Sequence, residues 1–140
     1  GTVNNNVAAS EGGGLWNGTG VMTVTGTTIN GNTASGDDAD NGGGGLFNVG
    51  GNLIVTDTTI TGNVADGASG SGGGILNQGT LTVSGGEISS NTANRAGGAI
   101  EVTAASTTTL TDVAMDQNVA GPDGSAAPGN GDFGTAILGL

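Results

Sequence analysis

The chain has 140 residues and is rich in glycine, with 32 Gly against 2 Pro and no Cys. Its 12 acidic residues face one basic residue, Arg95, so that the formal net charge is −11. That charge repels phosphate groups and argues against nucleic-acid binding and adsorption to anionic membranes, and the lack of cysteine excludes disulfides and thiolate metal sites. No window approaches the ~20 consecutive apolar residues of a membrane-spanning helix, so we expect no membrane insertion.

A glycine-rich motif recurs along the whole chain. Each copy has two or three glycines followed by an apolar residue, and three copies end in asparagine. The copies are Gly12–Asn17, Gly43–Asn48, Gly72–Asn77 and, more loosely, Gly97–Val102. A period of about 25 to 31 residues is typical of a solenoid in which each repeat forms one coil. We expect a single domain over 1–140, with the end of an incomplete coil in 1–11, four coils in 12–133 and the start of a further coil in 134–140.

Each coil contains three short stretches rich in Thr, Val, Ile and Gly, which favour strands over helices. In the first complete coil these stretches are 13–17, Val21–Thr25 and Thr27–Asn30. In the second of them Met22 and Val24 alternate with polar residues, as in a strand with one buried face. The sequence therefore predicts an all-β fold, a parallel β-helix with three short strands per coil.

Parallel stacking of the coils places like residues above one another at a rise of ~4.8 Å. Aliphatic residues then form three interior columns. These are Leu15, Leu46, Ile75 and Ile100; Val24, Val55, Val83 and Leu110; and Ile29, Ile60, Ile88 and Met115. We expect the core to be a narrow prism built from these columns.

Asparagine recurs at two corners of the coil. One row is Asn32, Asn63, Asn91 and Asn118, and the other is Asn17, Asn48 and Asn77. Stacked side-chain amides can hydrogen-bond from coil to coil, and asparagine tolerates left-handed backbone. A catalytic or sugar-binding row is the alternative, but the residue type follows the repeat rather than a single place, which favours structural ladders.

The connections after the Asn32 row vary most in length and carry much of the charge, as loops do. We expect that two residues can be deleted between Asp37 and Asp40 with little effect on stability. Asp37, Asp38 and Asp40 also offer oxygen ligands of the kind that Ca²⁺ prefers. The chain has neither an EF-hand loop nor the nonapeptide calcium repeat, so these residues are a weak Ca²⁺ candidate and we expect no other cofactor.

An apolar stripe is predicted beside the first interior column. Trp16, Phe47 and Leu76 each follow a buried residue, so strand alternation turns them outward, and Leu138 continues the line beyond Glu101. An exposed apolar stripe usually marks a contact surface. Cover by a loop is the equal alternative.

Two ranks of mostly hydroxyl-bearing residues should line the outer face of the second strand. They are Thr23 and Thr25, Ile54 and Thr56, Thr82 and Ser84, and Thr109 and Thr111. A flat face of this kind resembles those of β-solenoid antifreeze proteins, although Thr is also simply a good exposed strand residue. Ice or surface binding is therefore an alternative function.

Catalysis receives little support. Asp57 and Asp112 occupy equivalent turns two coils apart, at roughly 9 to 10 Å, a separation that an inverting glycosidase can use. The other coils place Gly26 and Gly85 there, so the position is a turn where Gly and Asp interchange. The chain has no His, Lys or Tyr, and a polysaccharide-cleaving enzyme is the weakest alternative.

The glycine motifs, with a downstream Ile-x-x-Asn as in Ile29–Asn32 and Ile60–Asn63, resemble the repeats of bacterial parallel β-helix surface proteins, including polymorphic outer-membrane proteins and autotransporter passenger domains. The resemblance covers nearly the whole chain. It implies a right-handed β-helix and an extracellular or cell-surface location.

We therefore expect a non-enzymatic structural or adhesive β-helix, with a cell-surface or polysaccharide partner. Neither Gly1–Asn6 nor Ile137–Leu140 is the kind of polar or charged cover that natural solenoids place on their unpaired end strands. This favours a head-to-tail homo-oligomer that extends into a filament or stalk. The alternative is that a longer β-helix supplies the neighbouring coils covalently.

Overall fold

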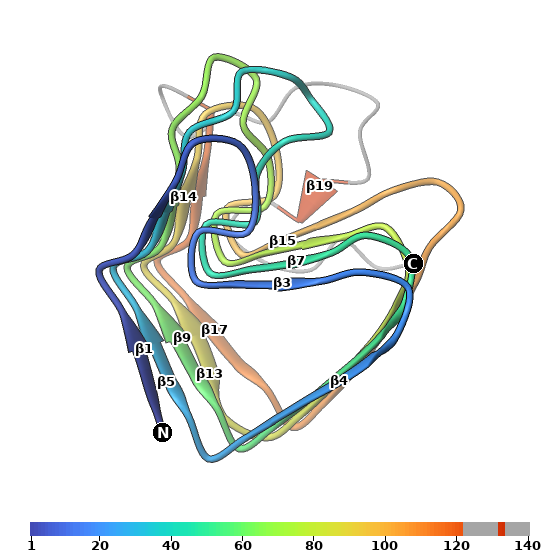
Figure 1. Cartoon of the computed structure of the whole chain (residues 1–140). Helices are drawn as coiled ribbons and strands as arrows, with labels where there is room; N and C mark the ends of the chain where they lie inside the picture. The colour runs from blue at the N-terminus through green and yellow to red at the C-terminus, as the bar shows by residue number, and fades with distance from the viewer. Residues whose placement is uncertain (122–131, 134–140) are drawn as a thin grey trace.

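The chain folds into a parallel β-solenoid of about four turns in the computed structural model, which describes residues 1–121 and 132–133. Figure 1 looks along the stack, with successive coils lying one behind another from blue to orange. All described elements are strands, so the predicted all-β β-helix is confirmed.

Two of the four sheets lie on the side of the stack where the chain begins (Figure 1). In spatial order, sheet A contains β1 (Thr2–Asn4), β5 (Thr28–Asn30), β9 (Thr59–Thr61), β13 (Glu87–Ser89) and β17 (Ala114–Asp116). Sheet B contains β2 (Val7–Ala8), β6 (Thr33–Ala34), β10 (Val64–Ala65), β14 (Thr92–Ala93) and β18 (Val119–Ala120). Both sheets are parallel and begin one coil before the other two.

The remaining two sheets close the prism. Sheet C contains β3 (Leu15–Asn17), β7 (Leu46–Asn48), β11 (Ile75–Asn77), β15 (Ile100–Val102) and β19 (Asp132–Phe133). Sheet D contains β4 (Val21–Thr25), β8 (Asn52–Thr56), β12 (Thr80–Ser84) and β16 (Thr107–Thr111). The four complete coils therefore run β3–β6, β7–β10, β11–β14 and β15–β18.

Each coil has four strands rather than the three predicted. The additional strand belongs to sheet B and follows the Asn corner, as in Thr33–Ala34. Two residues are too few to show an alternating pattern, which explains why the sequence did not reveal it. Its second residue points inward and is alanine in every coil, where the strands of sheet B turn toward sheet C.

The last strand differs from all others in direction. β19 pairs with β15 in antiparallel register, Ile100 opposite Phe133 and Glu101 opposite Asp132. An antiparallel strand therefore occupies the edge of sheet C, which was expected to lie open for a further parallel coil. The predicted further coil in 134–140 lies outside the described residues.

The three predicted columns form the core. Strand register places Leu15, Leu46, Ile75 and Ile100 in line, and it aligns the Val24 and Ile29 columns in the same way. In the two middle coils these side chains are fully buried. The terminal coils hold the partly buried ones, because each has a neighbouring coil on one side only.

Glycine is required where corners of adjacent coils touch. A Cβ on Gly44 would lie 2.5 Å from the carbonyl oxygens of Gly73 and Val64, which is far inside contact distance. Gly13 likewise meets backbone of the next coil and of its own coil, whereas Gly73 and Gly98 meet Thr92 and Val119 of their own coils. The glycine motif thus allows close packing both between coils and within each coil.

Candidate functional site

The Asn32 row forms a continuous ladder of side-chain amides. The Nδ2 atoms of Asn32, Asn63 and Asn91 each donate to the Oδ1 atom of the next asparagine, at 2.9, 3.0 and 3.0 Å. The ladder starts one coil earlier than predicted, because Nδ2 of Asn6 donates to Oδ1 of Asn32 at 2.9 Å. Five amides therefore link all the coils along one corner.

Every internal amide of this ladder is saturated. Oδ1 of Asn63 accepts both the backbone N–H and the Nδ2 of Asn32. Its Nδ2 donates to the carbonyl of Ile29 and to Oδ1 of Asn91. Every amide-to-amide bond runs from Nδ2 of one coil to Oδ1 of the following coil, so the ladder is polar along the stack, with an acceptor at its first end and donors at its last.

The second asparagine row makes a shorter ladder. Nδ2 of Asn17 donates to Oδ1 of Asn48 at 2.8 Å, and Nδ2 of Asn48 donates to Oδ1 of Asn77 at 2.9 Å. In the fourth coil Val102 takes the asparagine position, and Nδ2 of Asn77 donates instead to Oγ1 of Thr108 at 3.0 Å. Both rows thus use their amides to bind coil to coil.

The predicted exposed stripe is wrong for two of its members. Phe47 is 2% exposed and Leu76 is fully buried, and only Trp16 is half exposed. The loops before β3, β7 and β15 fold back over the outer face of sheet C, where they appear as arches above these strands in Figure 1. Their contacts with the row include Glu11, whose Oε1 accepts from Nε1 of Trp16. Leu138 lies outside the described residues.

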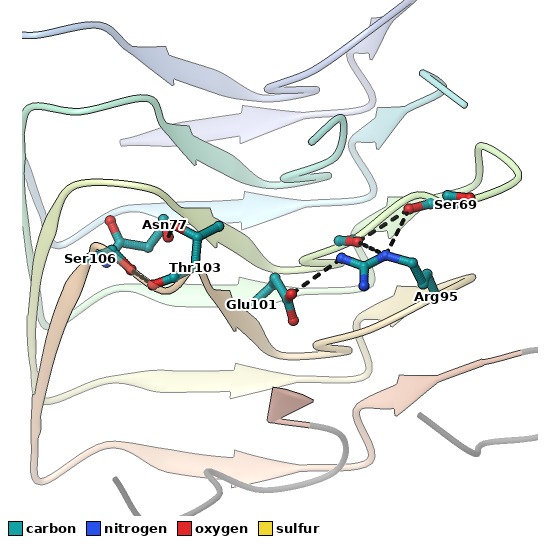
Figure 2. A network of polar contacts seen from close by, with 7 residues as sticks. Ser69, Asn77, Arg95, Glu101, Thr103 and Ser106 are labelled. Carbon is teal, nitrogen blue, oxygen red and sulfur yellow. Dashed lines mark hydrogen bonds and ion pairs between the residues drawn. The ribbon is translucent and has the colours of Figure 1, made fainter. Parts of the chain in front are cut away.

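The same row ends in a buried charge that sequence reasoning missed. Glu101 follows Leu76 in register and is 3% exposed, and its Oε1 lies 3.2 Å from Nη2 of Arg95. Nε of Arg95 donates to Oγ of Ser71 at 2.9 Å and to the carbonyl of Ser69 at 3.4 Å. Figure 2 shows the guanidinium lying between the loop that carries Ser69 and the strand that carries Glu101.

Two sequence signals point to this ion pair in retrospect. Arg95 is the chain's one basic residue, and Glu101 breaks a row that is otherwise apolar. The ion pair fixes the loop between β14 and β15 against sheet C. At the other end of β15, Oγ of Ser106 donates to the carbonyl of Thr103 (Figure 2).

The aspartates of the first loop do not come together as a metal site. Within residues 1–121 and 132–133, no three His, Cys, Asp or Glu side chains gather closely enough to hold an ion. Asp37 instead joins neighbouring loops, since its Oδ1 and its carbonyl accept from the N–H groups of Ala68 and Ser69, both at 3.0 Å. Asp38 and Asp40 are exposed.

The two hydroxyl ranks of sheet D are in register. Thr23, Ile54, Thr82 and Thr109 align in one rank, and Thr25, Thr56, Ser84 and Thr111 align in the other. The residues between them, such as Val55 and Val83, are buried, so both ranks face outward.

Backbone conformation explains why Asp57 and Asp112 occupy this turn. Asp57 and Asp112 have φ of 47° and 53°, and Gly26 and Gly85 have φ of 55° and 70° at the same turn. This is the left-handed region that glycine and aspartate tolerate best, so the shared position reflects turn geometry.

Comparisons of the chain with protein-family models, with curated proteins and with solved structures find no match. The described residues also include no helix with the length and hydrophobicity of a membrane span.

Proposed function

We propose that this chain is a non-enzymatic structural scaffold, an extracellular or cell-surface β-solenoid that builds length and presents its outer faces for adhesion. The observation that carries the proposal is the use made of its polar side chains. The asparagines repeat at fixed corners, and their amides bond one coil to the next rather than converging on one place. The repeated side-chain hydrogen bonds of this chain therefore stabilise the stacking of its coils.

The charge supports a role outside the cell or at its surface as an exposed rod. A net charge of −11 keeps neighbouring rods apart and soluble while stacking acts along the axis. The resemblance of the glycine and Ile-x-x-Asn motifs to bacterial surface-protein repeats supports the same location. The outer faces of sheets A and D are rich in Thr, with some Asn and Ser, and these side chains suit contact with a polysaccharide or a receptor on another cell.

Immunogold electron microscopy of the intact source material tests this proposal. We expect an antiserum raised against the folded chain to label the outer surface or thin fibres extending from it. Labelling confined to the cell interior would contradict the proposal. A glycan array probed with the same folded chain would then identify the carbohydrate class that sheets A and D contact.

Ice or crystal-surface binding is a second candidate, supported by the aligned ranks on sheet D. The strands of this sheet are stacked in parallel at ~4.8 Å, so the hydroxyl groups repeat regularly in two directions. Measurement of thermal hysteresis at high protein concentration tests it, with Thr82→Lys as the variant that interrupts one rank. Absence of hysteresis in the unmodified chain would remove this function.

A further inference from the structure

Apolar residues are more exposed at the two ends of the solenoid than in the middle of the stack, where the core columns are fully buried. The large apolar residues most exposed in the described part of the chain are Val7, Trp16 and Val21, all on the first turn of strands, β1–β4. The partly buried core residues also lie only at the ends. They are Val3, Leu15 and Met22 at the first end and Leu110, Val113 and Met115 at the last.

The asparagine ladder leaves complementary groups at these ends. Within the described residues no donor reaches Oδ1 of Asn6, although each later Oδ1 in the row accepts two hydrogen bonds. At the other end Nδ2 of Asn118 donates to the carbonyl of Ile88, and its second hydrogen and its backbone N–H have no acceptor in that part of the chain. An acceptor at one end thus matches two donors at the other.

The backbone provides a second complementary pair. In each coil the residue after the ladder asparagine donates its N–H to the carbonyl of the preceding ladder asparagine. The pairs are Thr33 to Asn6, Val64 to Asn32, Thr92 to Asn63 and Val119 to Asn91, at 2.9, 2.8, 2.9 and 2.9 Å. By the same register the N–H of Val7 and the carbonyl of Asn118 point out of the stack at opposite ends.

The two end segments also share one conformation. Residues 2–8 and 114–120 occupy the same places in sheets A and B, so Val3 and Met115 belong to one core column. The left-handed residue before the ladder asparagine has φ of 56° in both, at Asn5 and at Gln117. One end is therefore shaped as the next coil of the other.

We propose that β1–β2 of one copy pair in parallel with β17–β18 of a second copy, at the register of the internal coils. Asn118 then donates its N–H and Nδ2 to Oδ1 of Asn6 in the other copy, and Val7 donates its N–H to the carbonyl of Asn118. Met115 covers Val3. Sheets A and B carry this contact, because β19 holds the corresponding edge of sheet C.

This junction deepens the proposed scaffold function and rests on it. The contact joins different surfaces on the two copies, so it repeats without closing and generates a filament. It also assigns partners to Oδ1 of Asn6, to the N–H of Val7 and to the backbone and Nδ2 groups of Asn118, which a non-specific apolar contact would not do. The stack of one chain is thereby extended by the same ladder that holds its own coils together.

Charge substitutions at Asn4 test the register. Asn4 is exposed on β1, and in the junction it lies one coil from Asp116 in the same outward row. Asn4→Lys should lower the critical concentration for assembly, measured by sedimentation velocity at low salt, by about two- to fivefold, and Asn4→Asp should raise it as much. Thr2→Lys and Thr2→Asp are the matched controls, since Thr2 meets uncharged Ala114 there, and we expect much smaller changes from them. Equal effects at the two positions would overturn the register.

Val7 tests the backbone contact. Val7→Pro removes the outward N–H on an edge strand, where proline is tolerated, so the monomer should keep its circular dichroism spectrum and melting temperature while assembly is lost. Val7→Thr keeps the N–H and places there the residue found at Thr33 and Thr92, so it should assemble normally. Assembly of Val7→Pro at the unmodified concentration, or a monodisperse unmodified chain at high concentration, would overturn the proposal.

These outcomes separate the junction from the scaffold function. Surface labelling of the source material together with a monodisperse purified chain would refute self-stacking and leave the scaffold standing, with a coil of a longer polypeptide or another protein as the occupant of the β1–β2 edge. If the purified chain forms filaments and the Asn4 and Thr2 variants behave as expected, but the source material shows no surface labelling, the junction would be supported and the location refuted.

Discussion

Nη2 of Arg95 lies 3.2 Å from Oε1 of Glu101, so the chain's one basic residue is used to compensate a carboxylate that is 3% exposed. The corresponding positions in the three earlier coils are Trp16, Phe47 and Leu76. Burying a charge is unfavourable unless it is paired and hydrogen-bonded. The fourth coil therefore has an ion pair at the position where the second and third coils bury an apolar side chain.

Removing one partner of this pair should cost more than removing both. Arg95→Met leaves Glu101 without its cation, and we expect a loss of about 3 to 5 kcal/mol in the free energy of unfolding. The double variant Arg95→Met, Glu101→Leu restores the apolar row and should be neutral or stabilising. Urea unfolding monitored by circular dichroism measures both. A double variant as unstable as the single one would contradict this account.

The asparagine ladder should be sensitive at its centre. Asn63→Leu leaves the N–H and Nδ2 of Asn32 and the carbonyl of Ile29 without their partner, each at about 1 to 3 kcal/mol. We expect a total loss of more than about 3 kcal/mol. Asn30→Ala is the control, because Asn30 is exposed and its change should stay within about 0.5 kcal/mol. Similar melting temperatures for the two variants would refute a stabilising ladder.

Positions that repeat could be predicted from the sequence. The core columns and both asparagine rows follow from one residue type returning at one place, because parallel stacking converts period into proximity. Even the interchange of Gly26 and Asp57 at one turn was predictable, and both have positive φ. Strand alternation then assigned inside and outside correctly wherever a single layer separates the core from solvent.

Alternation failed where a second layer covers the strand. It placed Phe47 and Leu76 outside the prism, which is true of the strand, but the loops before them lie over that face. Loop length does not follow the period, so the sequence could not show which loops fold back. For the same reason the sequence did not show that neighbouring loops are bonded to each other, as Asp37 is to Ala68 and Ser69 of the next loop.

The alternation within sheet D gives a sharp contrast between neighbours. Val55→Asp places a charge in the core without a partner, and we expect a loss of at least about 4 kcal/mol, enough to unfold the middle coils. Ile54→Asp makes the same change on the outward side of the same strand and should cost about 1 kcal/mol or less. Hydrogen exchange measures which coils open. Equal losses of amide protection would contradict the register of sheet D.

The glycine corners provide a test of coil-to-coil packing. Gly44→Ala would place its Cβ 2.5 Å from a carbonyl oxygen of the next coil and from one of its own coil, so the backbone must shift at both contacts, and we expect a large fall in melting temperature. Gly50→Ala is the matched control, because a Cβ there meets no atom within 4 Å. It should be neutral or raise stability by about 0.4 to 1 kcal/mol, since alanine restricts the unfolded chain. A tolerated Gly44→Ala would refute the close approach.

Salt should promote end-to-end assembly of the unmodified chain. Each copy carries a net charge of −11, and at low salt the copies repel one another over a Debye length of about 30 Å at 0.01 M, which falls to about 10 Å at 0.1 M. The groups that form the proposed junction are hydrogen-bonding and apolar, so screening weakens the repulsion without weakening the contact. The critical concentration, measured by light scattering, should therefore fall as sodium chloride is raised over this range. In the Asn4→Lys variant, salt also screens the attraction between the new lysine and Asp116. The critical concentration of this variant should therefore fall less steeply with salt than that of the unmodified chain. A critical concentration that rises with salt in the unmodified chain would mean that ion pairs hold the copies together, and the hydrogen-bonded ladder would then not be the contact between them.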